Sequence, residues 1–258
     1  MIVRAVAVLC SALLIWAAPA CADRIGTIAR VKSAVVAVGT FQRTRAPPFQ
    51  FRGTGFAVGD GTTIVTNAHV LPAATDTAKL ETLAILVPAS HGEAGGKTEV
   101  REARAVAVDP TLDLAVLKIE GPALVALKLR EDDDVREGQE IFLTGFPIGA
   151  VLGPYPATHR GIVSAVTPIA IPQPRAGALN TRVIRKLASG AFPVFQLDAT
   201  AYPGNSGSPV YDPDSGDVLG IVNMVLVKAT KEAALTDPSG ITYAVPVRHL
   251  RQLLNSLR

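Results

Sequence analysis

The sequence contains very little cysteine. Only two of its 258 residues are cysteine, Cys10 and Cys21, and both lie within the first 22 residues. The rest of the chain therefore has no thiol that could act as a nucleophile, join a disulfide or bind zinc. His91, His159 and His249 match no metal-ligand spacing, so we expect no metal and no cofactor.

Charged residues are also scarce, at 18%, and 25 Lys and Arg nearly balance 22 Asp and Glu. They are scattered, with no basic run of the kind that follows a phosphate backbone, so we expect no nucleic-acid partner. Hydrophobic residues make up 48% of the chain, which excludes global disorder because such a chain can bury a sizeable core.

The chain has one apolar run in its leader, Ala5–Ala18, which follows the positive charge of Arg4. This run is shorter than the roughly 20 residues that span a bilayer. Ala20-Cys21-Ala22 fits the small-x-small cleavage pattern, so residues 1–22 are predicted to be a signal peptide for export to the periplasm or the medium. No membrane span is expected after its removal. The alternatives are an uncleaved anchor and a lipid anchor on Cys21, the latter disfavoured by Ala18 where lipoprotein signals usually carry Leu.

Residues 23–258 contain many short, apolar, β-branched segments punctuated by Gly, Pro and Asp. A break at 121–138 separates two sets of six, which predicts an all-β fold of two antiparallel barrels, about 27–125 and about 135–245. The expected strands are Val31–Val38, Gly55–Val58, Thr62–Thr66, Leu83–Val87, Ala103–Val108, Leu114–Ile119, Glu140–Phe146, Gly161–Val166, Val194–Leu197, Ser208–Tyr211, Val218–Met224 and Ile241–Val245.

One helix is expected, over 247–258, where apolar residues recur at helical spacing after Pro246. The apolar positions are Val247, Leu250, Leu253, Leu254 and Leu257, and they are expected to dock on a barrel. Two stretches, 40–53 and 167–191, are expected to be loops.

Three polar residues stand at the edges of apolar strands: His69, Asp113 and Ser206. Each alone has an ordinary explanation, as a core histidine, a residue that opens a strand, and a turn serine. Together they appear in the chain order His, Asp, Ser that chymotrypsin-type triads use.

The chemistry explains these residue types. A serine hydroxyl is a weak nucleophile until a base removes its proton, and histidine can accept and return that proton near neutral pH. Asp113 would fix the imidazole tautomer and stabilise the imidazolium. Glycines beside Ser206 allow a tight turn, in which the N–H groups of Gly204 and Ser206 would form an oxyanion hole.

The chain resembles trypsin-like serine proteases of the HtrA/Deg type. The segments that carry the resemblance are 53–56, 66–70, Asp113–Ile119, 144–149, 161–165, 198–200 and 204–207. The resemblance implies two six-stranded β-barrels with the active site between them, endopeptidase activity on polypeptides, unfolded proteins among them, and no metal. The family often forms trimers, so Phe41, Phe49 and Phe51 could be an oligomer contact or could pack over a barrel edge.

Two features depart from this family. The sequence stops at Arg258, where a typical HtrA chain continues into PDZ domains, so we expect no PDZ-based recruitment. Ser208 stands where the family motif has a second glycine, and the resulting Gly-Asn-Ser-Gly-Ser-Pro is similar to secreted glutamyl endopeptidases. Those enzymes read Glu with a histidine on the next strand, and 220–224 has none, so Glu specificity is not expected.

Substrate preference follows from the same resemblance. Thr200 lies six residues before Ser206, where trypsin carries the Asp that selects Lys and Arg, so a basic P1 side chain is disfavoured. Val222 and Val225 would narrow an apolar slot for small aliphatic P1 residues. Asn223 is assigned to this substrate-binding set and could instead donate to Asp113 or be an ordinary strand residue.

Two other functions compete with an exported endopeptidase: a catalytically silent binding module on the same fold, and an acyl-hydrolase of small esters. The intact triad argues against the first, and the His, Asp, Ser order against the second. The 167–191 segment is a candidate activation loop that orders before the Gly204 N–H turns into the oxyanion hole.

Overall fold

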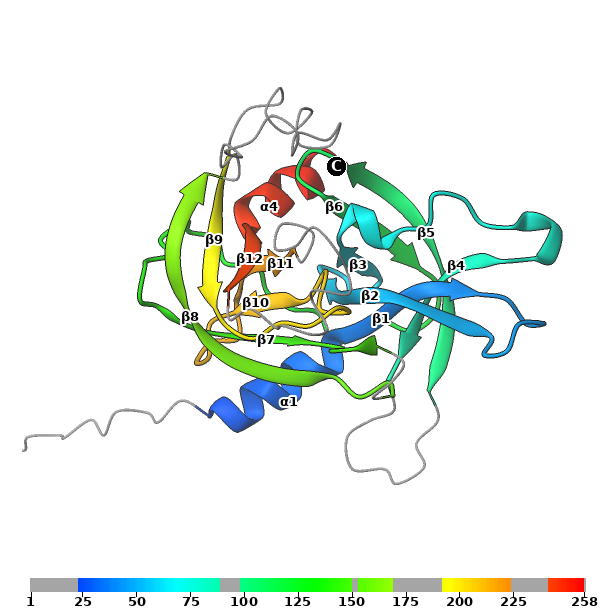
Figure 1. The fold of residues 1–258 in the computed structure, drawn as a ribbon, viewed down its shortest axis with the longest axis horizontal. Helices are drawn as coiled ribbons and strands as arrows, with labels where there is room; N and C mark the ends of the chain where they lie inside the picture. Colours follow the sequence, from blue (N-terminus) through cyan, green and yellow to red (C-terminus); the bar gives the residue numbers. More distant parts are fainter. Residues whose placement is uncertain (1–22, 89–97, 150–152, 169–191, 224–240, 258) are drawn as a thin grey trace, which may run out of the picture.

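The structure, a computed structural model, describes residues 23–88, 98–149, 153–168, 192–223 and 241–257. Within these residues the strands form two closed antiparallel barrels that lie side by side (Figure 1). The predicted all-β class with two six-stranded barrels is confirmed.

The first barrel has the strand order β1-β2-β3-β6-β5-β4. Its strands are β1 (Val35–Phe41), β2 (Phe49–Val58), β3 (Thr63–Thr66), β4 (Thr82–Val87), β5 (Glu99–Asp109) and β6 (Leu114–Ile119). Two short 3₁₀ helices, η1 (Ala68–Val70) and η2 (Thr77–Lys79), lie between β3 and β4.

The second barrel repeats this order when it is read as β7-β8-β9-β12-β11-β10. Its strands are β7 (Glu140–Gly145), β8 (Ala157–Pro168), β9 (Pro193–Asp198), β10 (Pro209–Tyr211), β11 (Val218–Val222) and β12 (Ile241–Pro246). The two halves therefore share a topology although the sequence shows no repeat, because a barrel requires apolar alternation and turns rather than particular residues.

The chain start differs from the prediction. Residues Arg24–Ala34 form helix α1, so the strand expected over Val31–Val38 begins only at Val35. The Asp23 carboxylate accepts the backbone N–H of Gly26 and caps the helix. Thr27, Val31 and Ala34 are buried at i, i+4 and i+7, a helical spacing that the β-branched composition obscured.

The expected loop over 40–53 is a hairpin instead. Phe41 and Phe49 face each other across β1 and β2, and Phe51 lies further along β2. Phe49 and Phe51 are partly buried against the central core, and the Phe51 ring meets Phe146 edge-on at 6.1 Å. This favours intramolecular packing for these two rings. The loop was expected from Pro47-Pro48, and these two prolines lie in the turn that joins the two strands of the hairpin.

Three buried clusters hold the molecule together. One fills the first barrel around Ile64, Ile85 and Leu117, and one fills the second around Leu143 and Leu197. The third joins both barrels, and its members include Phe56, Val65, Leu114, Tyr211, Ile221 and Val245. Because residues of both barrels pack together in this third cluster, the two barrels lie against each other.

The C-terminal helix α4 (Val247–Asn255) follows β12 directly, with Pro246 at its N-cap. Val247 and Leu250 are buried in the cluster that joins the barrels, and Leu253 and Leu254 pack against it. The predicted docking of this helix is confirmed as far as Leu254, whereas Leu257 lies beyond the helix and is 46% exposed.

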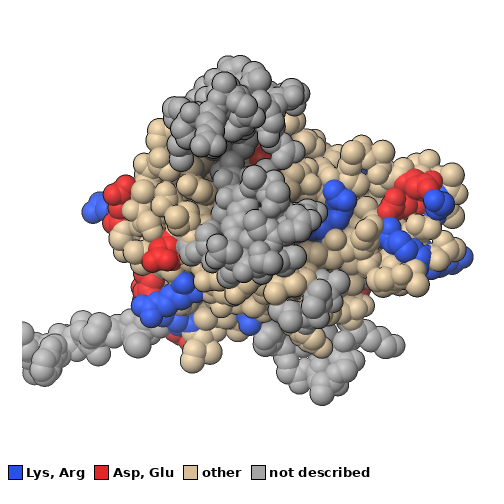
Figure 2. All heavy atoms as spheres, viewed as in Figure 1, with Lys and Arg blue, Asp and Glu red and all other residues tan. Residues whose placement is uncertain are grey.

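On the face shown in Figure 2, several Lys and Arg side chains (blue) lie close to Asp and Glu side chains (red). Many are paired, such as Arg45 with Glu81 and Arg251 with Asp133. Among the helices of the described residues, none is long and apolar enough to cross a membrane.

Candidate active site

His69, Asp113 and Ser206 lie together where the two barrels meet. His69 lies in η1 just after β3, Asp113 immediately precedes β6, and Ser206 lies in the turn before β10. His69 Nδ1 is 2.6 Å from Asp113 Oδ2, and His69 Nε2 is 3.0 Å from Ser206 Oγ. The three side chains thus form one continuous hydrogen-bonded line.

Hydrogen bonds to its backbone hold Asp113 in place. Its backbone has φ of +56°, a left-handed conformation that aspartate tolerates better than most residues. Its carbonyl accepts hydrogen bonds from the side chain of Asn67 at 3.0 Å and from the N–H of Ala68 at 3.1 Å. These two bonds from the segment after β3 explain why Asp113 keeps a strained conformation next to His69.

The Asp113 carboxylate accepts three hydrogen bonds. Oδ1 accepts the backbone N–H of His69 at 2.9 Å, and Oδ2 accepts His69 Nδ1 and Asn223 Nδ2, the latter at 2.9 Å. An ionised carboxylate offers acceptors only, so the proton of a neutral His69 resides on Nδ1. The lone pair of Nε2 then faces the Ser206 hydroxyl, which is the arrangement that a general base requires.

The turn that carries Ser206 depends on glycine at two positions. Gly204 has φ of +106°, and a Cβ there would lie 2.3 Å from Phe146 O. Gly207 has φ of +87°, and a Cβ there would lie 2.1 Å from Thr54 O. Both positions therefore exclude any larger residue, for conformational and for steric reasons.

The backbone N–H groups of Gly204 and Ser206 donate to no acceptor among the described residues. Most N–H groups in a folded protein are paired, so two neighbouring N–H groups that donate to no described residue are available to an oxygen atom of a ligand. Ser206 itself is only 6% exposed, so an oxygen bound there would be largely shielded from bulk water.

The four residues predicted to bind substrate differ in their surroundings. Asn223 donates to Asp113, so its side chain supports the triad. Val222 is fully buried within the core cluster of the second barrel. Thr200 is exposed just after β9. Val225 lies outside the described residues, as does most of the predicted activation loop at 167–191.

Sequence reasoning missed Thr54 and Asn67 as parts of the site. Thr54 is fully buried on β2, and it contacts the backbone of the turn that holds Ser206. Both residues lie in segments already singled out, Gly53–Phe56 and Thr66–Val70, but only as motif members. Their roles depend on contacts between segments 46 and 150 residues apart, which no local pattern reveals.

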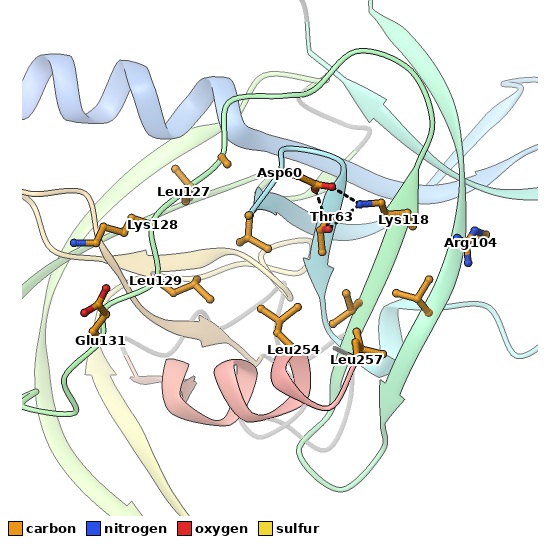
Figure 3. A pocket seen from close by; sticks show the side chains of 15 residues that line it. Asp60, Thr63, Arg104, Lys118, Leu127, Lys128, Leu129, Glu131, Leu254 and Leu257 are labelled. Carbon is orange, nitrogen blue, oxygen red and sulfur yellow. Dashed lines mark hydrogen bonds and ion pairs between the residues drawn. The ribbon is translucent and has the colours of Figure 1, made fainter.

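A separate hollow of about 990 Å³ lies between α4, the first barrel and the segment that joins the barrels (Figure 3). Leu127, Leu129, Leu254 and Leu257 line it, and Asp60, Thr63 and Lys118 form a polar edge joined by hydrogen bonds. The bond from Lys118 keeps the pKa of the Asp60 carboxyl well below its usual range. No residue of the triad lines this hollow.

The two barrels and the site between them define the class of trypsin-like serine peptidases. The family model of the trypsin-like peptidase domain matches residues 53–221, and the chain belongs to this family. The segment matched begins just before Thr54 and ends on β11, so it contains all three residues of the hydrogen-bonded line.

Within this class the similar proteins are of the HtrA type, as the sequence motifs predicted. The chain is 28% identical over 209 residues to a protein named probable periplasmic serine endoprotease DegP-like from Halomonas elongata. A protein of the same name from Brucella suis is 30% identical over 213 residues. These matches cover 80% of this chain, 35% of the first relative and 33% of the second, so the chain spans about a third of their length.

Solved structures agree with this assignment. The crystal structure of Deg5 is 25% identical with a TM-score of 0.59 and covers 89% of this chain and 91% of that one. The HtrA-type protease AlgW with a tripeptide is 26% identical with a TM-score of 0.61, covering 91% of this chain and 63% of that one.

Proposed function

We propose that this protein is an exported serine endopeptidase that uses His69, Asp113 and Ser206 as its catalytic triad. The observation that carries the proposal is the line of hydrogen bonds from Asp113 through His69 to Ser206, next to two unpaired N–H groups. A protein that only binds its partner has no need for a serine hydroxyl held 3.0 Å from an imidazole nitrogen, whereas a peptidase needs this contact for proton transfer.

The geometry supports a two-step acyl transfer. His69 Nε2 removes the Ser206 hydroxyl proton while Oγ attacks the scissile carbonyl carbon, and the carbonyl oxygen becomes an anion. The N–H groups of Gly204 and Ser206 stabilise that anion. His69 then gives its proton to the leaving amine, and water attacks the acyl-enzyme by the same route in reverse to free Ser206.

The substrates we propose are unfolded polypeptides in the periplasm, cut after small aliphatic residues. The relatives named above are periplasmic endoproteases, and a signal peptide over 1–22 would send this chain to the same compartment. The absence of a charged side chain at Thr200, which is exposed just after β9, supports an uncharged P1 preference. A peptide library that is cut after Lys, Arg or Glu would overturn this preference.

The test compares the full chain with its Ser206→Ala variant on unfolded casein and with a fluorophosphonate probe. Cleavage and labelling by the parent protein alone would support the proposal, with equal melting temperatures confirming that both fold. Labelling without cleavage would support a formed site of narrow specificity. A folded parent protein that neither cleaves nor labels would refute the proposal and favour a binding module. Turnover of small esters without peptide cleavage would also refute it, in favour of an acyl-hydrolase.

A further inference from the structure

We propose that Thr54 is a positioning residue that holds the oxyanion hole in its working geometry from the opposite barrel. The inference rests on the proposed function, since it assigns a role in that same reaction. Thr54 lies on β2 of the first barrel and is fully buried, whereas the hole belongs to the second barrel.

The turn that forms the hole is anchored by its carbonyl groups. The carbonyl of Pro203 accepts the N–H of Ile148 at 2.7 Å, and the carbonyl of Asn205 accepts the N–H of Ser208 at 3.0 Å. In a planar trans peptide the N–H points opposite to the carbonyl of the preceding residue. These two bonds therefore aim the N–H groups of Gly204 and Ser206, which follow Pro203 and Asn205.

Thr54 anchors the two remaining carbonyls of the turn. Its hydroxyl donates to Gly204 O at 2.7 Å, and its backbone N–H donates to Ser206 O at 2.8 Å. The same hydroxyl accepts the N–H of Phe146 at 3.1 Å, so both of its hydrogen-bonding capacities are used. One residue thus connects the turn before Ser206, the turn after β7 and the first barrel.

The choice of residue at 204 explains why this anchor is needed. Only glycine fits there, because a Cβ would meet Phe146 O, yet glycine leaves the backbone free to rotate. The peptide after Gly204 is held locally by the N–H of Asn205, which donates to Tyr202 O at 3.0 Å. The Thr54 hydroxyl binds the carbonyl oxygen of the same peptide, Gly204 O, and this hydrogen bond connects the peptide to the first barrel.

Thr54 is itself fixed by its surroundings. Its carbonyl accepts the hydroxyl of Thr66 on β3 at 2.7 Å, and this hydroxyl is buried as well. Gly145 leaves space for this hydroxyl, since a Cβ there would lie only 2.9 Å from Thr54 Oγ1. The position of the hole therefore depends on correct packing of one barrel against the other.

The test replaces Thr54 by valine, which keeps the shape and removes the hydroxyl, and by serine, which keeps the hydroxyl. The matched control is Thr144→Val, since Thr144 is also fully buried and its hydroxyl bonds to Thr158 and Tyr211 rather than to the Ser206 turn. The full-length variants are assayed for kcat and KM on a fluorogenic peptide taken from a casein cleavage site, for the rate of fluorophosphonate labelling, and for melting temperature.

We expect Thr54→Val to lower kcat and the labelling rate about 10- to 100-fold with little change in KM, because a misplaced donor weakens only the transition state. Thr54→Ser should restore most of the rate. Thr144→Val should lower the melting temperature as Thr54→Val does and leave kcat near that of the parent. If Thr54→Val does not fold, Thr54→Cys takes its place. The cysteine thiol is a weaker hydrogen-bond donor than the threonine hydroxyl, so we expect a loss of kcat that is smaller than the loss expected for Thr54→Val.

If the parent protein is active and Thr54→Val has the same kcat as Thr144→Val, the role of Thr54 is overturned and the proposed function stands. Loss of rate in Thr54→Ser equal to that in Thr54→Val would also overturn it, because the hydroxyl would then be irrelevant. An inactive, unlabelled parent protein would refute the proposed function, and the role of Thr54 would fail with it.

Discussion

Replacement of Asp113 by asparagine separates the catalytic role that we propose for this residue from its structural role. The backbone N–H of His69 cannot turn, so the oxygen of the new amide is expected to accept it in place of Oδ1. The NH₂ group then occupies the place of Oδ2, which lies 2.6 Å from His69 Nδ1. That group can only donate, so the histidine proton moves to Nε2 and points at Ser206. His69 can no longer act as a base.

The magnitude of this change follows from the tautomer. In triads of this kind the wrong tautomer lowers kcat by about 10⁴-fold, which corresponds to about 5.5 kcal/mol of transition-state free energy. The free energy of unfolding should fall by only ~1–3 kcal/mol, because charge-assisted hydrogen bonds to Asp113 are replaced by neutral ones. In a domain of this size that is roughly 2–12 °C in melting temperature. We therefore expect Asp113→Asn to be folded and nearly inactive.

A double variant provides the control. Asp113→Asn combined with Asn223→Asp restores an amide and a carboxylate in mutual contact but leaves the NH₂ group facing His69. The melting temperature should recover, and the casein cleavage and fluorophosphonate labelling rates should not. The reasoning fails if Asp113→Asn retains kcat within about tenfold of the parent protein, or if the double variant recovers activity.

Three further predictions concern stability. Gly207→Ala should abolish cleavage and lower the melting temperature, because its Cβ would clash with Thr54 O. The control is Gly59→Ala, at φ +60° with no atom within 4 Å, which should stay active and lower the free energy of unfolding by ~1–2 kcal/mol. Equal cleavage rates and equal melting temperatures in the two variants would contradict this prediction. Leu250→Ala should reduce the free energy of unfolding by about 2–5 kcal/mol in urea denaturation, and by more than Leu253→Ala. Thr40, the Asp76 N–H and Arg45 lower the pKa of Glu81 from 4.5 to about 2, so its stabilising effect is present above pH 4.5 and is lost as the pH falls toward 2. The melting-temperature gap between the parent protein and Glu81→Gln should narrow over that range, and a gap independent of pH would refute it.

The strand pattern could be predicted because each barrel strand is short, apolar and bounded by turn residues. The expected segment Leu114–Ile119 coincides with β6, and the segment Thr62–Thr66 differs from β3 by one residue. The start of the chain could not be predicted in the same way. Val31 is β-branched and favours a strand, yet the cap at Asp23 and the burial of Thr27, Val31 and Ala34 favour a helix. Tertiary packing overrides a weak local preference in such a segment.

The candidate triad could be proposed from residue types, chain order and strand edges, because the chemistry of acyl transfer admits few alternatives to serine, histidine and aspartate. The supporting residues could not. For Asn223 the sequence left three roles open, in substrate binding, as a donor to Asp113 and as an ordinary strand residue, and the structure shows the bond to Asp113. Which of these roles an asparagine takes depends on what lies opposite, and the sequence does not contain that information directly.

The sequence by itself determined the class of fold, the three residues proposed as the triad and the glycines that the Ser206 turn requires, since these follow from periodicity, chemistry and local conformation. Only the tertiary structure decided how the two barrels share the site. Thr54 contacts the Ser206 turn from 150 residues away, and Asn67 and His69 contact Asp113 from the segment after β3. Such contacts arise when closed sheets pack their apolar faces together, and this packing fixes distances between segments that no local pattern relates.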